Sequence, residues 1–392
     1  MAGTTTAVAE TPDVAPPTRQ RTTLPREGRL WLLATLVLWL TGWVKGINLI
    51  LLLAYLLLLL WGLNWWAARR SLRGVSARRN LRGPVFAGTP FVWEVEAADE
   101  GKRALTGWEL VDEGPGHALR WFVLNLAPGE RLRLRRELVL PRRGHYDCRP
   151  LKAVSSYPFG LVRQEAELAG ADRLTVLPRL GTLHGGRLRR GLAQTGRPDE
   201  RARRTRRRLG LEVEFHGLRA FRPGDSPRWI HWRTTARSGE LMVREFDHGT
   251  HHDLLLFVEP FAAGGGTEGP LESAVSLAAT VCWAWTHEAG DRVVLAVAGA
   301  EPLVADGRGV PSQALELLDR LAGVEGTPTP DVAALVRGLR AVPLPAGPAL
   351  LVSTRQGDGR TAEELSRRLE RPVAYIDATA PPSFYHPPDA AV

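Results

Sequence analysis

The chain has 392 residues, 44% of them hydrophobic and 24% charged, and its formal net charge is +9. This length exceeds what one hydrophobic core usually organises, so two or three folded units are expected. The composition excludes a wholly disordered chain, a collagen-like chain and a polytopic transporter. Only three of the 51 basic residues are lysines, a bias that GC-rich coding explains as simply as a polyanionic partner does.

The two cysteines, Cys148 and Cys282, lie far apart and outside any CxxC or Cys/His cluster. Neither a disulfide scaffold nor a zinc module is therefore expected. The folded part is expected in the reducing cytoplasm, and no cofactor is indicated.

Two uncharged apolar stretches follow residues 1–28, which are rich in Thr, Ala and Pro and are expected to form a disordered cytoplasmic leader. The first runs from Leu30 to Val44 and the second from Ile47 to Trp66. At about 1.5 Å per residue the second spans roughly 30 Å, the thickness of a bilayer core, whereas the first is marginal alone. Together they predict a transmembrane helical hairpin over residues 29–67.

Basic residues flank this hairpin on both outer sides, and only Lys45 lies between the two stretches. The positive-inside rule then places both termini and the soluble domains in the cytoplasm, with the lipid bilayer of the cell (inner) membrane as partner. A cleaved signal peptide and a buried core hairpin are the alternatives. No small-residue cleavage site separates the stretches, which favours the membrane hairpin.

The middle of the chain, residues 84–180, consists of short alternating segments separated by turn residues. Phe91–Glu96, Leu119–Leu124 and Leu132–Leu140 alternate in polarity and are bounded by Gly and Pro. This spacing predicts a β-sandwich-like domain.

Residues 251–378 have a different pattern, in which short buried-strand runs alternate with helical periods. The strand runs are Asp253–Glu259, Asp291–Val297, Ala349–Ser353 and Val373–Ile376. Strands that alternate with helices predict an α/β doubly wound domain with a parallel sheet.

Two further segments look like flexible connectors. Residues 185–209 form an Arg-rich linker, with ten arginines between 187 and 208, and residues 379–392 form a Pro-rich tail. The arginines suit a solvated linker best and contact with anionic lipid headgroups next. Nucleic acid ranks last, because RNA binding would need interleaved aromatic residues and there are none.

Residues 210–250 carry the most specific pattern. Pro223-Gly224 predicts a turn, Asp225 is placed as an N-cap, and Gly239 follows the end of a helix predicted over residues 226–237. A strand is expected from Leu241 to Phe246. A packing corner stabilised by charge pairs is the alternative to a functional site.

The run EFHGLRAFRPGDSPRWIHWRTTARSGELMVREF, residues 214–246, resembles the signature of the family called domain of unknown function 58. The pieces Arg142-Arg-Gly-His-Tyr and Ser156-Tyr-Pro-Phe-Gly-Leu-Val are similar to an earlier element of that family. The resemblance covers most of residues 30–250. It implies a membrane-anchored protein with a β domain and a von Willebrand factor A-like domain, associated with MoxR-type AAA+ ATPases in assembling or maturing other proteins, and with no assigned enzymatic activity.

One departure concerns metal binding. Magnesium-binding von Willebrand A domains end their first strand in Asp-x-Ser-x-Ser, whose oxygens suit a hard cation. Here the strand ends Glu259-Pro260-Phe261-Ala262-Ala263, so Glu259 alone offers a side-chain oxygen. A metal ion is not expected at this position.

The resulting hypothesis is a non-enzymatic membrane adaptor that binds an AAA+ ATPase or its client. A charged corner would serve this interaction, built from Arg219, Gly224, Asp225, Arg228, Trp232 and Arg237. The first alternative is a membrane-bound hydrolase using Asp225 and His231, although six positions on one helix put them about 120° apart. The second is an anionic lipid or nucleic-acid binder acting through the Arg-rich run.

Overall fold

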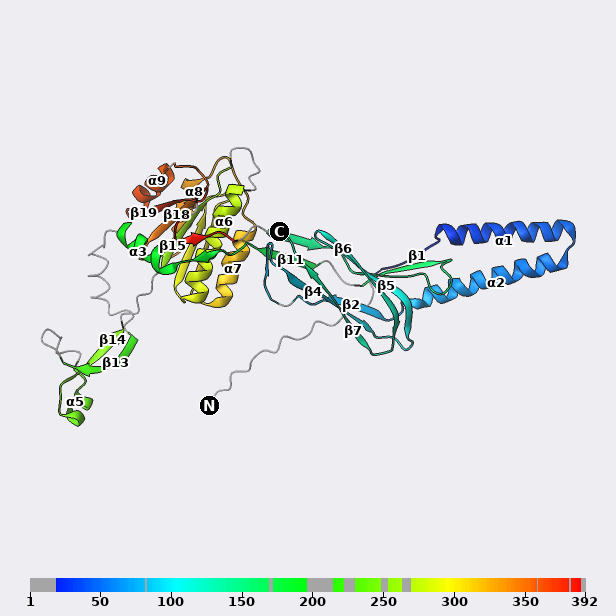
Figure 1. The fold of residues 1–392 in the computed structure, drawn as a ribbon, viewed down its shortest axis with the longest axis horizontal. Coiled ribbons are helices and arrows are strands. Elements are labelled where there is room, and N and C mark those ends of the chain that lie inside the picture. Colours follow the sequence, from blue (N-terminus) through cyan, green and yellow to red (C-terminus); the bar gives the residue numbers. More distant parts are fainter. Residues whose placement is uncertain are drawn as a thin grey trace. The chain divides into compact units, whose positions relative to one another are not determined.

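The computed structural model describes residues 19–81, 83–168, 172–195, 214–221, 230–247, 253–262, 269–357, 359–380 and 382–388. The chain divides into two compact units, Met1–Leu177 and Pro178–Ala390. The first combines two long helices with β-sheets, and the second is mainly an α/β domain (Figure 1). The multi-domain organisation is therefore as expected.

Two helices begin the first unit, α1 (Arg26–Lys45) and α2 (Asn48–Ser71). They are joined at Gly46, whose φ of 65° is left-handed, and they run side by side in opposite directions (Figure 1). The Trp31 indole N–H donates to the Leu57 carbonyl oxygen over 3.4 Å. A Cβ on Gly42 would lie 3.0 Å from Leu51, so this glycine permits the close approach.

Within the described residues, α2 is the one helix whose length and apolarity suit a membrane span. Its Trp66 is 52% exposed, and Leu30 and Val44 on α1 are 65% and 67% exposed. Ile47, 44% exposed, is the N-cap of α2. A buried core helix would not present such apolar surface. That α2 and α1 cross a membrane stays a prediction.

The β part of the first unit contains strands in three sheets, ordered β1-β10-β9-β5-β6, β3-β11-β8 and β2-β4-β7. Their bounds are β1 (Arg19–Thr23), β2 (Val75–Arg79), β3 (Val85–Phe86), β4 (Phe91–Asp99), β5 (Leu105–Gly114), β6 (His117–Leu126), β7 (Arg131–Leu138), β8 (Gly144–Cys148), β9 (Lys152–Ser155), β10 (Arg163–Glu167) and β11 (Asp172–Leu177). One core cluster takes side chains from all three sheets, including the fully buried indoles of Trp93 and Trp108. The alternating segments of the sequence thus form strands that share one apolar core.

The prediction that residues 1–28 form a disordered leader is wrong for residues 19–23. Arg19–Thr23 forms β1, which pairs antiparallel with β10 from Arg19↔Glu167 to Thr23↔Arg163. The Thr22 hydroxyl also donates to the Gln164 side chain over 2.6 Å. The five residues of β1 are all polar, so no hydrophobic pattern in the sequence indicates a strand. Backbone pairing with β10 makes this segment a strand. Residues 1–18 lie outside the described residues.

The second unit contains a five-stranded sheet in the order β17-β16-β15-β18-β19. Neighbouring strands are parallel except for the β16·β17 pair, which is antiparallel. The elements are β15 (Leu254–Glu259), α6 (Gly269–Cys282), the π-helical turn η2 (Trp283–Glu288), β16 (Arg292–Val297), β17 (Leu303–Arg308), α7 (Pro311–Ala322), α8 (Val332–Leu339), β18 (Ala349–Ser353), α9 (Arg360–Leu369) and β19 (Val373–Asp377).

Helices cover both faces of this sheet (Figure 1). On one face Leu255 and Phe257 of β15 share a core cluster with Leu335 and Leu339 of α8 and with Leu365 of α9. On the other face α6 contacts β15 and β18. All six residues of β15 and all five of β18 are buried, which explains why these strands are continuous apolar runs in the sequence.

Both expected connectors contain ordered structure, which corrects the prediction of flexible segments. Gly185–Thr195 forms helix α3, in which Leu188 and Leu192 are buried one turn apart. In the Pro-rich tail, β20 (Tyr385–His386) pairs with β12 (Thr182–Leu183). The Tyr385 ring is buried and its hydroxyl lies 2.9 Å from that of Ser276. Both segments are rich in arginine or proline, so their few apolar residues did not indicate a helix or a strand in the sequence. Residues 196–213 lie outside the described residues.

Candidate functional site

The described parts of residues 214–246, the run that resembles the family signature, form a two-stranded antiparallel ribbon and a short helix. β13 (Glu214–Ala220) pairs with β14 (Met242–Asp247), and a register shift between Phe215 and Gly217 marks a bulge. The expected strand at Leu241–Phe246 is confirmed within one residue. Helix α5 (Trp232–Ser238) lies between the strands in the sequence and ends at Gly239, which has a φ of 75°.

The helix begins later than predicted. Ile230 forms a β-bridge with Val243, and His231 has φ −88° and ψ 82°, so neither continues a helix from residue 226. His231 is the N-cap, because its Nδ1 accepts from the Thr234 backbone N–H over 3.3 Å. The residue proposed as partner of Asp225 in a hydrolase thus has one ring nitrogen engaged in capping.

The predicted corner residues fall into two groups. Trp232 is the first residue of α5 and is 65% exposed, and Arg237 on the same helix is also exposed. Arg219 lies in β13 opposite Val243. The remaining residues, Gly224, Asp225 and Arg228, lie outside the described residues. Whether these side chains meet therefore stays a prediction.

The sheet of the second unit brings together a different set of polar side chains. Glu259 is the last residue of β15, and Ser353 is the last residue of β18, directly opposite it in register. The Ser353 hydroxyl donates to Glu259 Oε2 over 2.7 Å, and the Thr361 hydroxyl of α9 donates to Oε1 over 3.0 Å. Glu259 is only 1% exposed, so the sheet end holds a buried carboxylate with both oxygens hydrogen-bonded.

An arginine supplies the opposite charge. Arg355 follows β18, and its Nε lies 3.1 Å from Glu259 Oε1. The guanidinium carbon lies 4.1 Å from the centre of the Phe261 ring, within cation–π distance. Tyr375 donates its hydroxyl to the Arg355 carbonyl oxygen and holds this loop. The Arg355 side chain is 31% exposed, so the guanidinium joins the buried carboxylate to the surface.

This arrangement does not fit the metal ion that the resemblance to von Willebrand A domains raises. A divalent cation needs several oxygen ligands pointing at one open position. Among the side chains that meet at this sheet end, Glu259 provides the carboxylate, and Arg355 already lies beside it. Pro260, Phe261 and Ala262 follow in the chain without an oxygen-bearing side chain. The guanidinium therefore provides the positive charge at this position.

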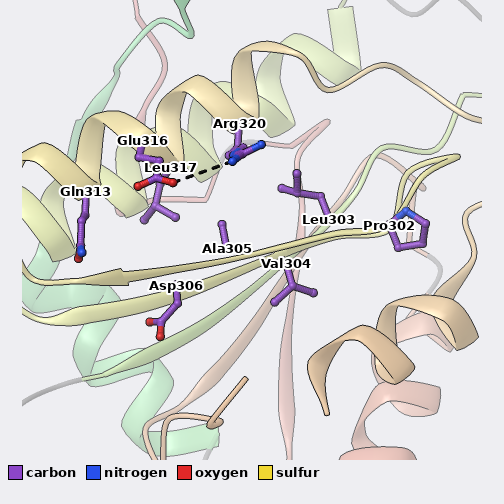
Figure 2. A pocket seen from close by; sticks show the side chains of 9 residues that line it. All are labelled: Pro302, Leu303, Val304, Ala305, Asp306, Gln313, Glu316, Leu317 and Arg320. Carbon is purple, nitrogen blue, oxygen red and sulfur yellow. Dashed lines mark ion pairs between the residues drawn. The ribbon is translucent and has the colours of Figure 1, made fainter. Parts of the chain in front are cut away.

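A cavity of about 450 Å³ lies between the edge strand β17 and α7 (Figure 2). Leu303 and Ala305 point towards α7, whereas Val304 and Asp306 point to the other side of the strand (Figure 2). A bidentate hydrogen bond from Arg292, with distances of 2.8 and 2.9 Å, lowers the pKa of Asp306. The charged side chains at this cavity are thus engaged in ion pairs, which include Glu316 with Arg320 at 4.0 Å.

A second buried charge pair lies in the β part of the first unit. Arg79 of β2 donates two hydrogen bonds to Asp112 of β5, over 3.2 and 2.7 Å. Their side chains are 2% and 0% exposed. The Trp93 indole N–H donates to the same carboxylate over 2.6 Å. Arg79 also donates to Asp172 of β11 over 2.9 Å, and because the Asp172 side chain is 49% exposed, this network joins the core where the sheets meet to the surface.

Sequence reasoning singled out Glu259 but missed Ser353, Arg355 and Thr361. The available signal was the Ser-Thr-Arg sequence at the end of an apolar strand, since α/β domains bind ligands at polar residues near the carboxyl ends of their parallel strands. The Arg79–Asp112 pair had no comparable signal.

Residues 217–359 match the family described as protein of unknown function DUF58. No curated protein matches the chain in sequence. Among solved structures, the chain is similar to a CARDB domain from Pyrococcus furiosus, in an NMR structure with 13% identity, a TM-score of 0.20, and coverage of 26% of this chain and 94% of that domain. The crystal structure of that domain, in complex with di-metal ions, gives 14% identity, a TM-score of 0.20, and 26% and 87% coverage.

β-Glucosidase 3B from Thermotoga neapolitana, in complex with glucose, is 15% identical with a TM-score of 0.13, and the similarity covers 26% of this chain and 16% of that enzyme. Similarities at this level carry no conclusion about fold or ligands.

Proposed function

We propose that this protein is a membrane-anchored, non-enzymatic adaptor working with a MoxR-type AAA+ ATPase in the assembly or maturation of client proteins, the role that the resemblance of residues 214–246 implies. In this proposal α1 and α2 form the transmembrane hairpin, both soluble units lie in the cytoplasm, and the second unit is a von Willebrand factor A-like domain that binds the partner.

The observation that carries the proposal is the Arg355 guanidinium at the sheet end. It is fixed by Glu259 on one side and by the Phe261 ring on the other, and about a third of the side chain is exposed. An immobilised guanidinium recognises carboxylates well, because little side-chain entropy is lost when the hydrogen bonds form. A partner that presents an acidic side chain would bind here.

The membrane part of the proposal is supported by the end of α2. The guanidinium of Arg69 lies 4.8 Å from the Trp65 ring centre, and that of Arg70 lies 4.1 Å from the Trp66 ring centre. Tryptophan and arginine at one end of an apolar helix are typical of a cytoplasmic membrane interface. The span and the arginines together support anchoring with the second unit in the cytoplasm.

The test is a binding measurement between the full-length protein in lipid nanodiscs and a purified MoxR-type ATPase from the same organism. The variants are Arg355→Ala, Arg355→Lys and the control Arg367→Ala, which removes an exposed arginine of α9. Hydrogen exchange first establishes a temperature at which every variant stays folded. Asp225→Ala is measured alongside them, because the predicted charged corner includes this residue.

We expect Arg355→Ala to weaken binding about tenfold to a hundredfold, as for loss of a charged hydrogen bond at an interface, whereas Arg367→Ala binds like the wild type. Equal binding by Arg355→Ala and Arg367→Ala would refute the role of Arg355. If the wild type binds no MoxR-type ATPase with any nucleotide, the partnership itself is refuted. Screening for hydrolase activity dependent on Asp225 and His231 would then be the next experiment.

A further inference from the structure

The loop between β9 and β10, residues 156–162, contains the second family-like element and has no part in the proposed adaptor site. Its two large aromatic side chains, Tyr157 and Phe159, are 46% and 57% exposed. Its next two apolar residues, Leu161 and Val162, are buried against Ala68 of α2 and pack with tryptophans of both helices. One part of the loop therefore contacts the helices, and the other presents aromatic rings beside them.

Hydrogen bonds hold this loop in one conformation. The Ser155 hydroxyl donates to the Gly107 carbonyl oxygen over 2.9 Å and accepts from the Tyr157 N–H over 3.2 Å. The Gly160 N–H donates to Ser156 over 2.8 Å. A Cβ on Gly107 would lie 2.9 Å from the Tyr157 ring, so glycine makes room for it. The aromatic rings are exposed on a loop that the domain holds in place.

The loop is also fixed against both helices. The Phe159 N–H donates to the side-chain oxygen of Asn64, a fully buried residue of α2, over 3.0 Å. A Cβ on Gly28, near the start of α1, would lie 2.0 Å from the Leu161 carbonyl oxygen. The Phe159 backbone therefore lies beside Asn64, at the same position along the axis of α2.

That position lies on the apolar side of the basic end of α2. Asn64 precedes Arg69 by five residues, which is about 7 to 8 Å along the helix axis. Interfacial aromatic and apolar groups enter a bilayer by about 5 to 10 Å below the headgroups. If Arg69 and Arg70 lie at the headgroups, Phe159 is at the depth where an amphipathic segment enters the acyl region.

We propose that residues Tyr157–Phe159 insert into the cytoplasmic leaflet and bind the β part of the first unit to the bilayer surface. The proposal rests on the proposed membrane anchoring by α2. The bilayer is the occupant because the loop that carries the exposed rings is held against the membrane-spanning candidate at its tryptophan-rich end. The unit would then contact lipid at two places, through α2 and through this loop.

The experiment places an environment-sensitive NBD label at single introduced cysteines of the full-length protein in phosphatidylcholine and phosphatidylglycerol vesicles. The labelled variants are Phe159→Cys, the span control Leu56→Cys and the water control Val92→Cys. Leu56 and Val92 are 51% and 55% exposed, and Val92 lies seven residues along β4 from Asp99, the end next to α2, which is roughly 23 Å. Both native cysteines are buried, and labelled wild type gives the background.

Quenching by lipids with a doxyl group near the headgroup reports insertion at position 159, and lipids with a doxyl group deep in the acyl chain report the span at position 56, which lies about 20 Å along α2 from Arg69. We expect the label at position 159 to be quenched at least about threefold more than at position 92, because it lies within about 10 Å of the headgroups. Quenching at position 56 without quenching at position 159 would overturn the proposal and leave the anchor standing. Without quenching at either position, both the anchor and the loop insertion fail. Quenching at position 159 alone would support insertion of the loop and overturn the span.

Discussion

Removing the guanidinium of Arg355 gives a direct test of how the sheet-end site is stabilised. Glu259 is almost fully buried, and Arg355 is the basic side chain paired with it at 3.1 Å. In Arg355→Ala the hydroxyl groups of Ser353 and Thr361 still donate to the carboxylate, but the positive charge is gone. The second unit is then expected to become less stable.

The size of the effect follows from the burial of the two partners. Breaking a fully buried ion pair by removing one partner costs about 3 to 5 kcal/mol. Arg355 is 31% exposed and water can partly replace it, so we expect a loss of about 2 to 3 kcal/mol. This corresponds to an opening equilibrium roughly 30- to 150-fold more favourable.

Hydrogen exchange measured by mass spectrometry is the suitable assay, because it resolves the two units within the full-length protein. Peptides covering β15 and β18 are expected to exchange faster by that factor in Arg355→Ala. Peptides covering β4 and β5 of the first unit serve as internal reference and are expected to be unchanged. Arg367→Ala is the matched control, since loss of an exposed arginine changes stability by less than about 0.5 kcal/mol.

The double variant Glu259→Gln/Arg355→Ala separates charge from packing. If the uncompensated carboxylate is the cause, removing its charge as well makes the combined loss smaller than the sum of the two single losses. Strict additivity, or an Arg355→Ala effect no larger than that of Arg367→Ala, would refute the view that the guanidinium compensates Glu259.

Three further predictions concern the rest of the molecule. Asp112→Asn leaves the buried Arg79 with the half-exposed Asp172, at 2.9 Å, as its remaining carboxylate partner, so exchange protection in β4 and β5 should fall by about 1 to 3 kcal/mol; a loss below about 0.5 kcal/mol would contradict this. Burial lowers the pKa of His117, so as the pH falls through the unfolded-chain pKa of about 6.5, the unfolded chain binds this proton before the folded chain does. Stability of the β part should therefore fall as the pH drops from about 7 to 5, and His117→Phe should reduce this dependence in thermal unfolding; an unchanged pH profile would contradict it. A chelator should leave the unfolding temperature of the wild type unchanged, because Arg355 provides the charge beside Glu259, and a clear decrease would show that a metal supports the fold.

Much of the α/β fold could be predicted from the sequence because its strands are buried on both faces and are therefore continuous apolar runs. The strand Ala349–Ser353 was placed at its observed bounds. The edge strand β17 was missed, because it contains Asp306 and Gly307, two residue types that are uncommon in strands. A Cβ on Gly307 would lie 2.6 Å from the Leu317 side chain, so this glycine allows α7 to pack closely on the strand.

The candidate site was less predictable because its members come from three separate elements. Ser353, Arg355 and Thr361 lie about a hundred positions from Glu259 in the sequence. They meet because β15 and β18 are adjacent parallel strands whose ends are in register at Glu259 and Ser353. Strand adjacency depends on how the whole sheet packs, and local residue patterns do not contain that information.

The pairing of β1 with β10 determines when the first unit can complete its sheet during synthesis. Thr22 emerges about 140 residues before its partner Gln164, and both helices are made in between. By the time β10 appears, the turn at Gly46 has already brought the start of α1 back beside the end of α2. The helix pair thereby shortens the chain that this pairing must close, from about 140 residues to about the 90 residues between the end of α2 and β10. Forming the helix pair correctly would thus be a step in folding the β part, and a chain that failed to form it would leave one edge of β10 unpaired.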